Sequence, residues 1–402
     1  MEEHWRDWKG TSSIWSAMHS LIHRLQSNDP NVTTLALTSE CEPHELKDFL
    51  QALEANTVIH TVVFRESFFA LRRIRQHLTF SDFVMYLEAI GRHATESLEI
   101  LPGMAGLVRG QLVSFLVNSP LKRLVAKSAI TFCNRRDVEC LAETLGQCPA
   151  LTHLQLTELF LVTLRQEPIL DPLLLHLSSS NTLKVLELSS GKRDYAFSFL
   201  SSSMLDAFLS HCPTLEYLSL CKLGLDDGPI QTIARHLAHH PSLKYLLLND
   251  NRQTPMANYA LVESLWTNQT VEHLECKSCN DLMEKWALEF WFTPEHWTFL
   301  EQVLDQNCTL QTLELWNGCS SNGSCSSCTS SSSSTKEQDG RPETMIPFYL
   351  TLNRIGRKQL LQSSLTNGLW PLYLEVIQDS PSSVYYFLKW CPGIFVGYMQ
   401  QP

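Results

Sequence analysis

The chain has 402 residues, 44% of them hydrophobic, and carries 42 acidic residues against 31 lysines and arginines. This acidic balance argues against nucleic acid or an anionic membrane as the main partner, because both reward a basic surface. No stretch approaches the ~20 apolar residues of a membrane-spanning helix. The first residues lack a signal-peptide profile. The thirteen cysteines are consistent with free thiols in a reducing compartment. We therefore expect a cytoplasmic protein, with the nucleus as the alternative.

The first element that the sequence predicts is a helical cap over residues 1–28. One apolar stripe at helical spacing supports it, formed by Trp15, Met18, Leu21, Ile22 and Leu25. A repeat array needs an atypical end of this kind, because its last open core face must be covered.

A short phrase then recurs along the chain. It reads QCPALTHLQL at 147–156, HCPTLEYLSL at 211–220 and HHPSLKYLLLND at 239–250. Its central apolar-x-apolar pair can be placed ten times, at Leu35/Leu37, Val62/Phe64, Leu98/Ile100, Leu124/Ala126, Leu154/Leu156, Leu186/Leu188, Leu218/Leu220, Leu246/Leu248, Leu274/Cys276 and Leu313/Leu315. Successive pairs are 26 to 39 residues apart, which is the period of a solenoid.

Each repeat is expected to hold one strand and one helix. The pair alternates, so both of its apolar side chains point to one face of a short strand. Helical spacing follows, as in Ile230, Ile233, Ala234 and Leu237, and again in Val138, Leu141, Ala142 and Leu145. Prolines 149, 213 and 241 then end the helix and lead into the next strand.

With these repeats the chain resembles the leucine-rich repeat family, in its ribonuclease-inhibitor-like type. The consensus L-x-x-L-x-L-x-x-N/C is completed at Asn251 and Cys279. The resemblance implies an α/β solenoid, a curved horseshoe with parallel strands on the concave face and helices on the convex face. It places about ten repeats in residues 29–317 of this stand-alone protein.

The end of the chain differs in composition. Residues 318–343 are rich in serine and cysteine with almost nothing to bury, which predicts a disordered loop. A C-terminal cap is expected over 344–402, with Tyr385, Phe387, Leu388 and Trp390 supplying bulk. Its FYLTLNRIGR block is similar to the closing segment of many stand-alone leucine-rich repeat proteins.

Metal and catalytic sites are not expected. Cys276 and Cys279 already occupy repeat positions, and Cys319, Cys325 and Cys328 have no nearby histidine, so free thiols are the interpretation and zinc the alternative. His239 and His240 follow a helix, where a surface position is typical, and Asp226 and Asp227 precede one, where capping is typical. We expect no catalytic residue, no cofactor and no enzymatic activity.

The outward strand positions supply the functional prediction. One column reads Lys184, Glu216, Lys244 and Glu272, and its alternating charge predicts a self-satisfied ladder. The next column reads Val185, Tyr217, Tyr245 and His273, with Leu247 beside them. Large amphipathic side chains grouped on an open sheet predict a protein-binding surface, with scattered surface aromatics as the alternative reading. The function expected is a non-catalytic protein-interaction scaffold.

Two further functions stay open because relatives in the family have them. Some activate GTPases, and Arg72, Arg73 and Arg75 are the candidates to stabilise a transferring phosphoryl group. Others are substrate-reading subunits of ubiquitin ligases, which need an adaptor-binding module. The 28-residue N-terminal segment looks too short to be one.

Overall fold

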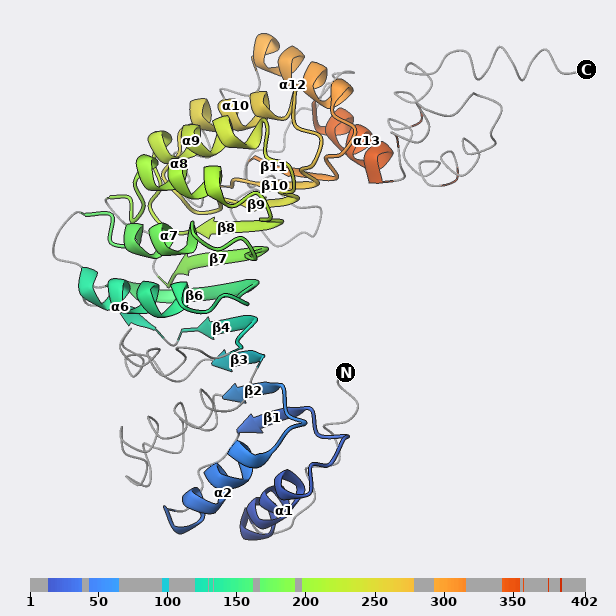
Figure 1. The fold of residues 1–402 in the computed structure, drawn as a ribbon. Helices are drawn as coiled ribbons and strands as arrows, with labels where there is room; N and C mark the ends of the chain where they lie inside the picture. The colour runs from blue at the N-terminus through green and yellow to red at the C-terminus, as the bar shows by residue number, and fades with distance from the viewer. Residues whose placement is uncertain are drawn as a thin grey trace, which may run out of the picture. The chain divides into compact units, whose positions relative to one another are not determined.

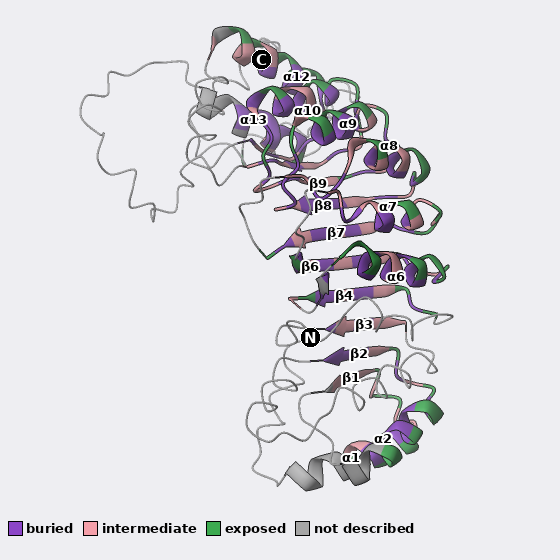
Figure 2. Ribbon diagram, turned by 90° about the vertical axis from the view of Figure 1, so that its left-hand side faces the viewer, coloured by how far each residue is buried: buried purple, intermediate pink, exposed green. Residues whose placement is uncertain are grey.

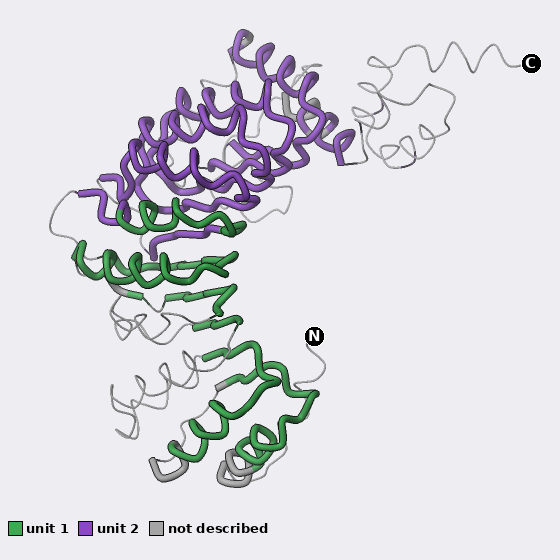
Figure 3. The backbone as a smooth tube through the Cα atoms, in the orientation of Figure 1, with its two compact units in different colours: residues 1–165, 172–185 green, residues 166–171, 186–402 purple. Residues whose placement is uncertain are grey.

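The structure is a computed structural model that divides the chain into two compact units (Figure 3). Unit 1 comprises residues 1–165 and 172–185, and unit 2 comprises residues 166–171 and 186–402. In both units, short parallel strands alternate with helices along the chain (Figure 1). The residues described are 14–37, 43–64, 96–100, 120–128, 130–132, 134–161, 167–191, 197–277, 293–315, 342–354, 357, 375 and 384.

Unit 1 contains the first five of the ten predicted strands, in chain order. Each pair of neighbours is parallel, and the residues Leu35, Val62, Leu98, Leu124 and Leu154 lie opposite one another from strand to strand. All five are buried, so the predicted register holds in the early copies too. A strand that the sequence did not predict, β5, pairs with the second half of β6. The strands are β1 (Thr34–Leu37), β2 (Thr61–Phe64), β3 (Ser97–Ile100), β4 (Arg123–Lys127), β5 (Thr131–Phe132) and β6 (His153–Leu161).

Unit 2 contains the other five strands, again in chain order. Leu218, Leu246, Leu274 and Leu313 lie opposite one another in parallel register, and all are buried. Sequential parallel strands are the arrangement of a solenoid and not of a doubly wound sheet, as the sequence predicts. The strands are β7 (Val185–Ser190, whose first residue belongs to unit 1), β8 (Tyr217–Cys221), β9 (Tyr245–Leu247), β10 (His273–Glu275) and β11 (Thr312–Glu314).

The helices bury one face each and leave the other in solvent (Figure 2). Ile230, Ile233 and Leu237 of α9 are all buried, as their spacing predicts. In the described part of unit 1 the helices are α1 (Ile14–Gln26), α2 (Pro43–Ala55), α6 (Arg135–Gly146) and most of α7 (Asp171–Leu177). In that of unit 2 they are α8 (Ser202–His211), α9 (Asp227–Leu237), α10 (Pro255–Ser264), α12 (Pro294–Gln306) and α13 (Pro342–Arg354).

A left-handed residue recurs at one fixed position of the repeat. Ser128, Glu158, Lys222 and Asp250 have φ between 51° and 61°, and each lies four residues after the first core leucine of its repeat. Non-glycine residues adopt this conformation uncommonly. Ser128 and Lys222 directly follow β4 and β8, whereas Glu158 lies within β6, which continues to Leu161. The backbone therefore makes the same turn at this position in both units.

Asn251 secures that turn in unit 2. Its side chain is buried, accepts hydrogen bonds from the Leu223 and Leu225 amides, and donates to the Leu220 and Leu248 carbonyls at 2.7 and 2.9 Å. The N/C consensus position therefore satisfies backbone groups of two neighbouring repeats at once.

A second polar position lies six residues before the first core residue of a repeat. At Asn56, Asn268 and Asn307, the side-chain oxygen accepts two backbone N–H groups that lead into the strand, and the side-chain nitrogen donates to a carbonyl of the preceding repeat. His240 occupies this position in its own repeat. The expectation that His240 lies at the surface is therefore wrong, since it is 5% exposed and its Nδ1 accepts from Ser242 and Leu243.

The two aspartates at the start of α9 also differ from expectation. Asp226 is the N-cap, but its side chain makes no capping hydrogen bond. Asp227 instead accepts from the backbone N–H and the hydroxyl of Thr254, both at 2.7 Å, and so joins α9 to the start of α10. Asp171 holds Ser201 in the same way, at 2.8 and 2.6 Å.

Polar residues of the FYLTLNRIGR block bind the last described repeat. Asn353 donates to the carbonyls of Asn307 and Leu310, and Arg357 donates to those of Leu304 and Asp305. Arg357 is 1% exposed, so these bonds compensate a buried guanidinium.

Several predictions fall outside the described residues. They concern residues 318–341 of the predicted loop with its three cysteines, the arginines at 72, 73 and 75, Cys279, the side chains of Trp15 and Met18, and the aromatic residues after 384. The last two residues of that predicted loop, 342 and 343, begin α13 instead. The boundaries of the four predicted segments stay a prediction. Among the helices that the structure describes, none has the length and apolar character needed to cross a bilayer.

Candidate protein-binding surface

Three aromatic rings lie side by side on neighbouring strands of unit 2. Tyr217 of β8, Tyr245 of β9 and His273 of β10 occupy matching positions in the parallel register. The Tyr245 and His273 rings are stacked, with centroids 4.5 Å apart and planes 7° apart. The Tyr217 and Tyr245 rings are tilted by 34°, with centroids 5.8 Å apart. The three rings form a continuous column, in which each ring contacts its neighbour.

The column faces away from the core because of strand alternation. The residue after each ring is a leucine with no exposed surface, at positions 218, 246 and 274. The rings themselves are only half-buried, as is Leu247, which lies opposite Ser219 and Glu275 on the same face. We call Tyr217, Tyr245, Leu247 and His273 the aromatic face.

Val185 belongs to a different unit from the other predicted site residues. It is the half-buried first residue of β7 and the last residue of unit 1, whereas the aromatic face belongs entirely to unit 2. Its backbone N–H donates to the Thr152 carbonyl within unit 1.

Carboxylates surround the aromatic face. Burial, followed by the neighbouring Glu187, Cys221 and Glu275, raises the pKa of Tyr217 to about 12. The Tyr217 hydroxyl therefore keeps its proton at neutral pH and remains a hydrogen-bond donor. Glu187 and Glu275 occupy the middle position of their apolar-x-apolar pairs, as Leu247 does in its own pair. This position also points outward, but the sequence prediction included only Leu247 from it.

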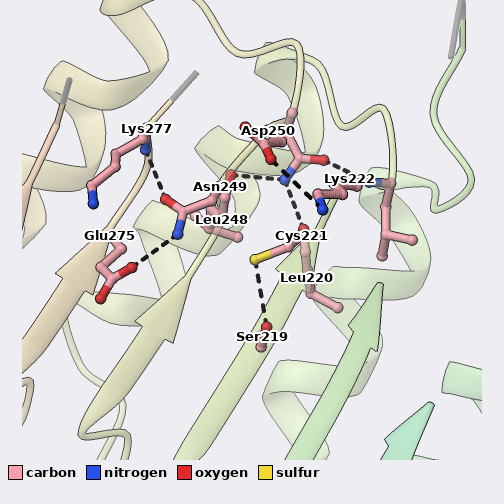
Figure 4. Close-up of polar contacts among 11 residues, drawn as sticks. Ser219, Leu220, Cys221, Lys222, Leu248, Asn249, Asp250, Glu275 and Lys277 are labelled. Carbon is pink, nitrogen blue, oxygen red and sulfur yellow. Dashed lines mark hydrogen bonds and ion pairs between the residues drawn. The ribbon is translucent and has the colours of Figure 1, made fainter. Parts of the chain in front are cut away.

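Asn249 organises the polar edge of this surface (Figure 4). Its side-chain amide donates to Glu275 and accepts from the backbone N–H of Lys277, both at 2.9 Å. Beside it, the Lys222 ammonium lies 4.0 Å from the Asp250 carboxylate. The amide thus fixes Glu275 while leaving its negative charge unchanged.

The predicted charge ladder forms only in part. Lys244 pairs with Glu216, at 3.5 Å between Nζ and Oε2. Glu272 instead accepts from the neutral amide of Gln311 at 3.3 Å. The alternating column predicted that a lysine would compensate the charge of Glu272, and this part of the ladder does not form.

The described cysteines do not form a metal site. Six are free thiols, and Cys276 is fully buried in the core, where burial raises its pKa. A raised pKa disfavours the thiolate that zinc needs. Among the residues that the structure describes, no group of three or more His, Cys, Asp or Glu side chains could hold a metal.

The chain matches no family model and no curated protein sequence. Among solved structures, it is similar to the leiomodin-1 actin-binding site 2, with 14% identity and a TM-score of 0.30 over 57% of this chain and 91% of that one. It is also similar to a chain of the Rad7 and Elc1 complex in yeast, with 13% identity and a TM-score of 0.42 over 76% of this chain and 84% of that one. We infer nothing about function from likenesses this distant.

Proposed function

We propose that this protein is a non-catalytic recognition module that binds another protein through the aromatic face of unit 2. The observation that carries the proposal is the column of three adjoining, half-exposed rings on adjacent strands, of which Tyr245 and His273 are stacked. Water-exposed sheet faces are normally polar, so a contiguous group of this kind is a feature that folding alone does not require.

Stacked aromatic residues suit protein recognition for a physical reason. Tyrosine offers a large contact area with few rotatable bonds, so ordering it on binding costs little conformational entropy. Here the stack has already ordered the rings before any partner arrives. Central, preorganised aromatic residues are the side chains that most often dominate binding energy.

Our proposal for the class of repeat protein rests on the repeat pattern. We place the protein in the ribonuclease-inhibitor-like class of leucine-rich repeat proteins, because strand and helix alternate with a period of 26 to 39 residues. On this basis we propose a cytoplasmic protein, without cofactor, metal or membrane and without nucleic acid as a ligand. Nothing in the described residues favours the GTPase-activating or ubiquitin-ligase alternatives.

Site-specific photo-crosslinking tests the proposal. p-Benzoylphenylalanine is introduced into the full chain at Leu247, on the aromatic face, or at Met256, which is 57% exposed on α10. After irradiation in cells, we expect an adduct of defined mass from position 247, absent from position 256. The adduct should disappear when Tyr217→Ala and Tyr245→Ala are added.

Three results would overturn the proposal. These are the absence of any adduct at position 247, equal adducts at both positions, and an adduct at 247 that survives the tyrosine substitutions. Circular dichroism of the double variant ensures that loss of the adduct does not reflect unfolding.

A further inference from the structure

We infer that the partner presents a basic segment, in which lysine or arginine side chains bind alongside the aromatic face. This inference rests on the proposed function and specifies the chemistry of the ligand. It follows from the charges on the strands of unit 2, which do not balance.

Acidic residues outnumber lysines on these strands and the residues that flank them. Three of the lysines lie beside an acidic partner: Lys222 pairs with Asp250, Lys244 with Glu216 and Lys277 with Glu314. The six acidic residues are Glu187, Glu216, Asp250, Glu272, Glu275 and Glu314, against Lys184 and the three lysines just named. Six acidic residues against four lysines leave an excess of two negative charges.

Two carboxylates flank His273 in the sequence of β10 and the residue before it. Glu272 directly precedes His273, and Glu275 follows two residues later at the next outward position. Each is held by a neutral amide, from Gln311 at 3.3 Å and from Asn249 at 2.9 Å. Among the described residues, neither forms an ion pair with a lysine or an arginine, so both are oriented but uncompensated.

A lysine or arginine side chain complements both the apolar surface of the aromatic face and the carboxylates beside it. Lysine and arginine bury their apolar stems against apolar surface while their charged ends stay at its edge. Leu247 and the stacked rings supply the apolar surface, and Glu272 and Glu275 accept the charged end. A charge-assisted hydrogen bond to a carboxylate is about twice as strong as a neutral one.

The same charges disfavour other ligands. An acidic peptide or a nucleic-acid backbone would bring negative groups toward Glu187, Glu272 and Glu275, and the Coulomb energy would oppose binding. Basic ligands would also associate faster at low ionic strength, because the potential steers their approach.

The experiment is a selection of random 16-residue peptides displayed on phage. The full chain is the bait, and the folded Tyr217→Ala/Tyr245→Ala variant is used for counter-selection, so that retained peptides depend on the aromatic face. We expect the retained pool to be enriched in lysine and arginine. Fluorescence anisotropy with synthetic copies of the retained peptides then measures their affinities.

Two matched pairs of substitutions distinguish a local effect of charge on binding from a general effect of charge removal on the protein. Glu272→Gln with Glu275→Gln should weaken the retained peptides about tenfold, since two charge-assisted contacts are lost. Glu143→Gln with Glu263→Gln removes the same number of charges from exposed positions on α6 and α10 and should change affinity less than about twofold.

The outcomes distinguish this inference from the proposed function. An empty pool after counter-selection would contradict both. A retained pool without enrichment in basic residues, or with affinities that Glu272→Gln/Glu275→Gln leaves unchanged, would overturn the basic partner and leave the aromatic face as a binding surface.

Discussion

The two units share their inward strand positions and differ in their outward ones. Both bury an apolar residue at the first core position of every strand, in matched register. At the preceding, outward position, unit 1 has Thr34, Thr61, Ser97, Arg123 and His153, whereas Tyr217, Tyr245, His273 and Thr312 occupy it in unit 2.

Polar contacts join outward side chains of three strands in unit 1. Arg123 forms an ion pair with Glu99 on β3 and donates to Gln155 on β6 at 3.3 Å. In unit 2 the rings of Tyr217, Tyr245 and His273 contact one another but leave part of their surface to solvent. The comparison teaches that inward positions specify the fold, while outward positions can differ between units that share it.

We expect the largest loss of stability from substitutions of the inward leucines, which test whether the inward positions of the two units are equivalent. Leu218→Ala in unit 2 and Leu154→Ala in unit 1 should each lower the free energy of unfolding by about 2–5 kcal/mol, through lost burial and the cavity left behind. Both leucines have no exposed surface. Denaturant titration of the full chain measures the change. A benign substitution at either site would show that the two units do not share one core design.

A second pair of variants separates buried from surface amides. Asn251→Ala should cost about 2–3 kcal/mol, because the amides of Leu223 and Leu225 lose their acceptor inside the protein. Asn249→Ala is the control, since Asn249 is half-buried and water can replace its bonds to Glu275 and Lys277. Chemical denaturation of both variants should give the smaller loss for Asn249→Ala, and equal losses would contradict the role assigned to Asn251.

The outward columns should contribute less to folding. Tyr217→Ala with Tyr245→Ala should cost about 1–2 kcal/mol of stability, because stacking and partial burial are lost. Binding of a partner to the aromatic face should fall further, by about 2 kcal/mol or more for each ring. Arg123→Ala in unit 1 should leave binding unchanged. If the double variant unfolds, the rings belong to the core, and the comparison between the units fails.

Much of the fold is predictable because period and alternation leave one face for the core. The first residue of each of the ten apolar pairs lies in a parallel strand, and the helix stripes at Val138 and at Ile230 are buried. In the last three pairs the second residue lies one position after the strand, at Leu248, Cys276 and Leu315. The same alternation places Tyr217, Tyr245 and His273 outward. By contrast, β5 was not predicted, since two residues are too few to show alternation.

Side-chain hydrogen bonds were the main failures of prediction. The partner of Glu272 is Gln311, 39 residues away, and neither the charge column nor local spacing points to that choice. Asp227 was assigned to its own helix, although it holds Thr254 of the next. For His240 a signal existed: it lies six residues before a core leucine, where Asn268 and Asn307 also lie.

The smallest predicted effect is a pH dependence at His240, within unit 2. Burial, in the main, lowers the pKa of this imidazole below its usual 6.5, and the ring must stay neutral because Nδ1 accepts the amides of Ser242 and Leu243. The unfolded chain then binds a proton at higher pH than the folded chain does. Stability from this group is therefore complete above pH 6.5 and is lost as the pH falls through the folded-state pKa.

Replacing His240 by asparagine should remove this loss and keep the fold. At positions 268 and 307, asparagine accepts the two equivalent amides without titrating. His240→Asn should therefore match the wild type near pH 8 and exceed it near pH 5.5 when urea unfolding is followed at both values. His239→Asn, at the exposed neighbouring position, is the control and should keep the wild-type response to pH. If His240→Asn loses stability in parallel with the wild type as the pH falls, the acid sensitivity originates elsewhere, and the histidine does not take the role that asparagine has in the other repeats.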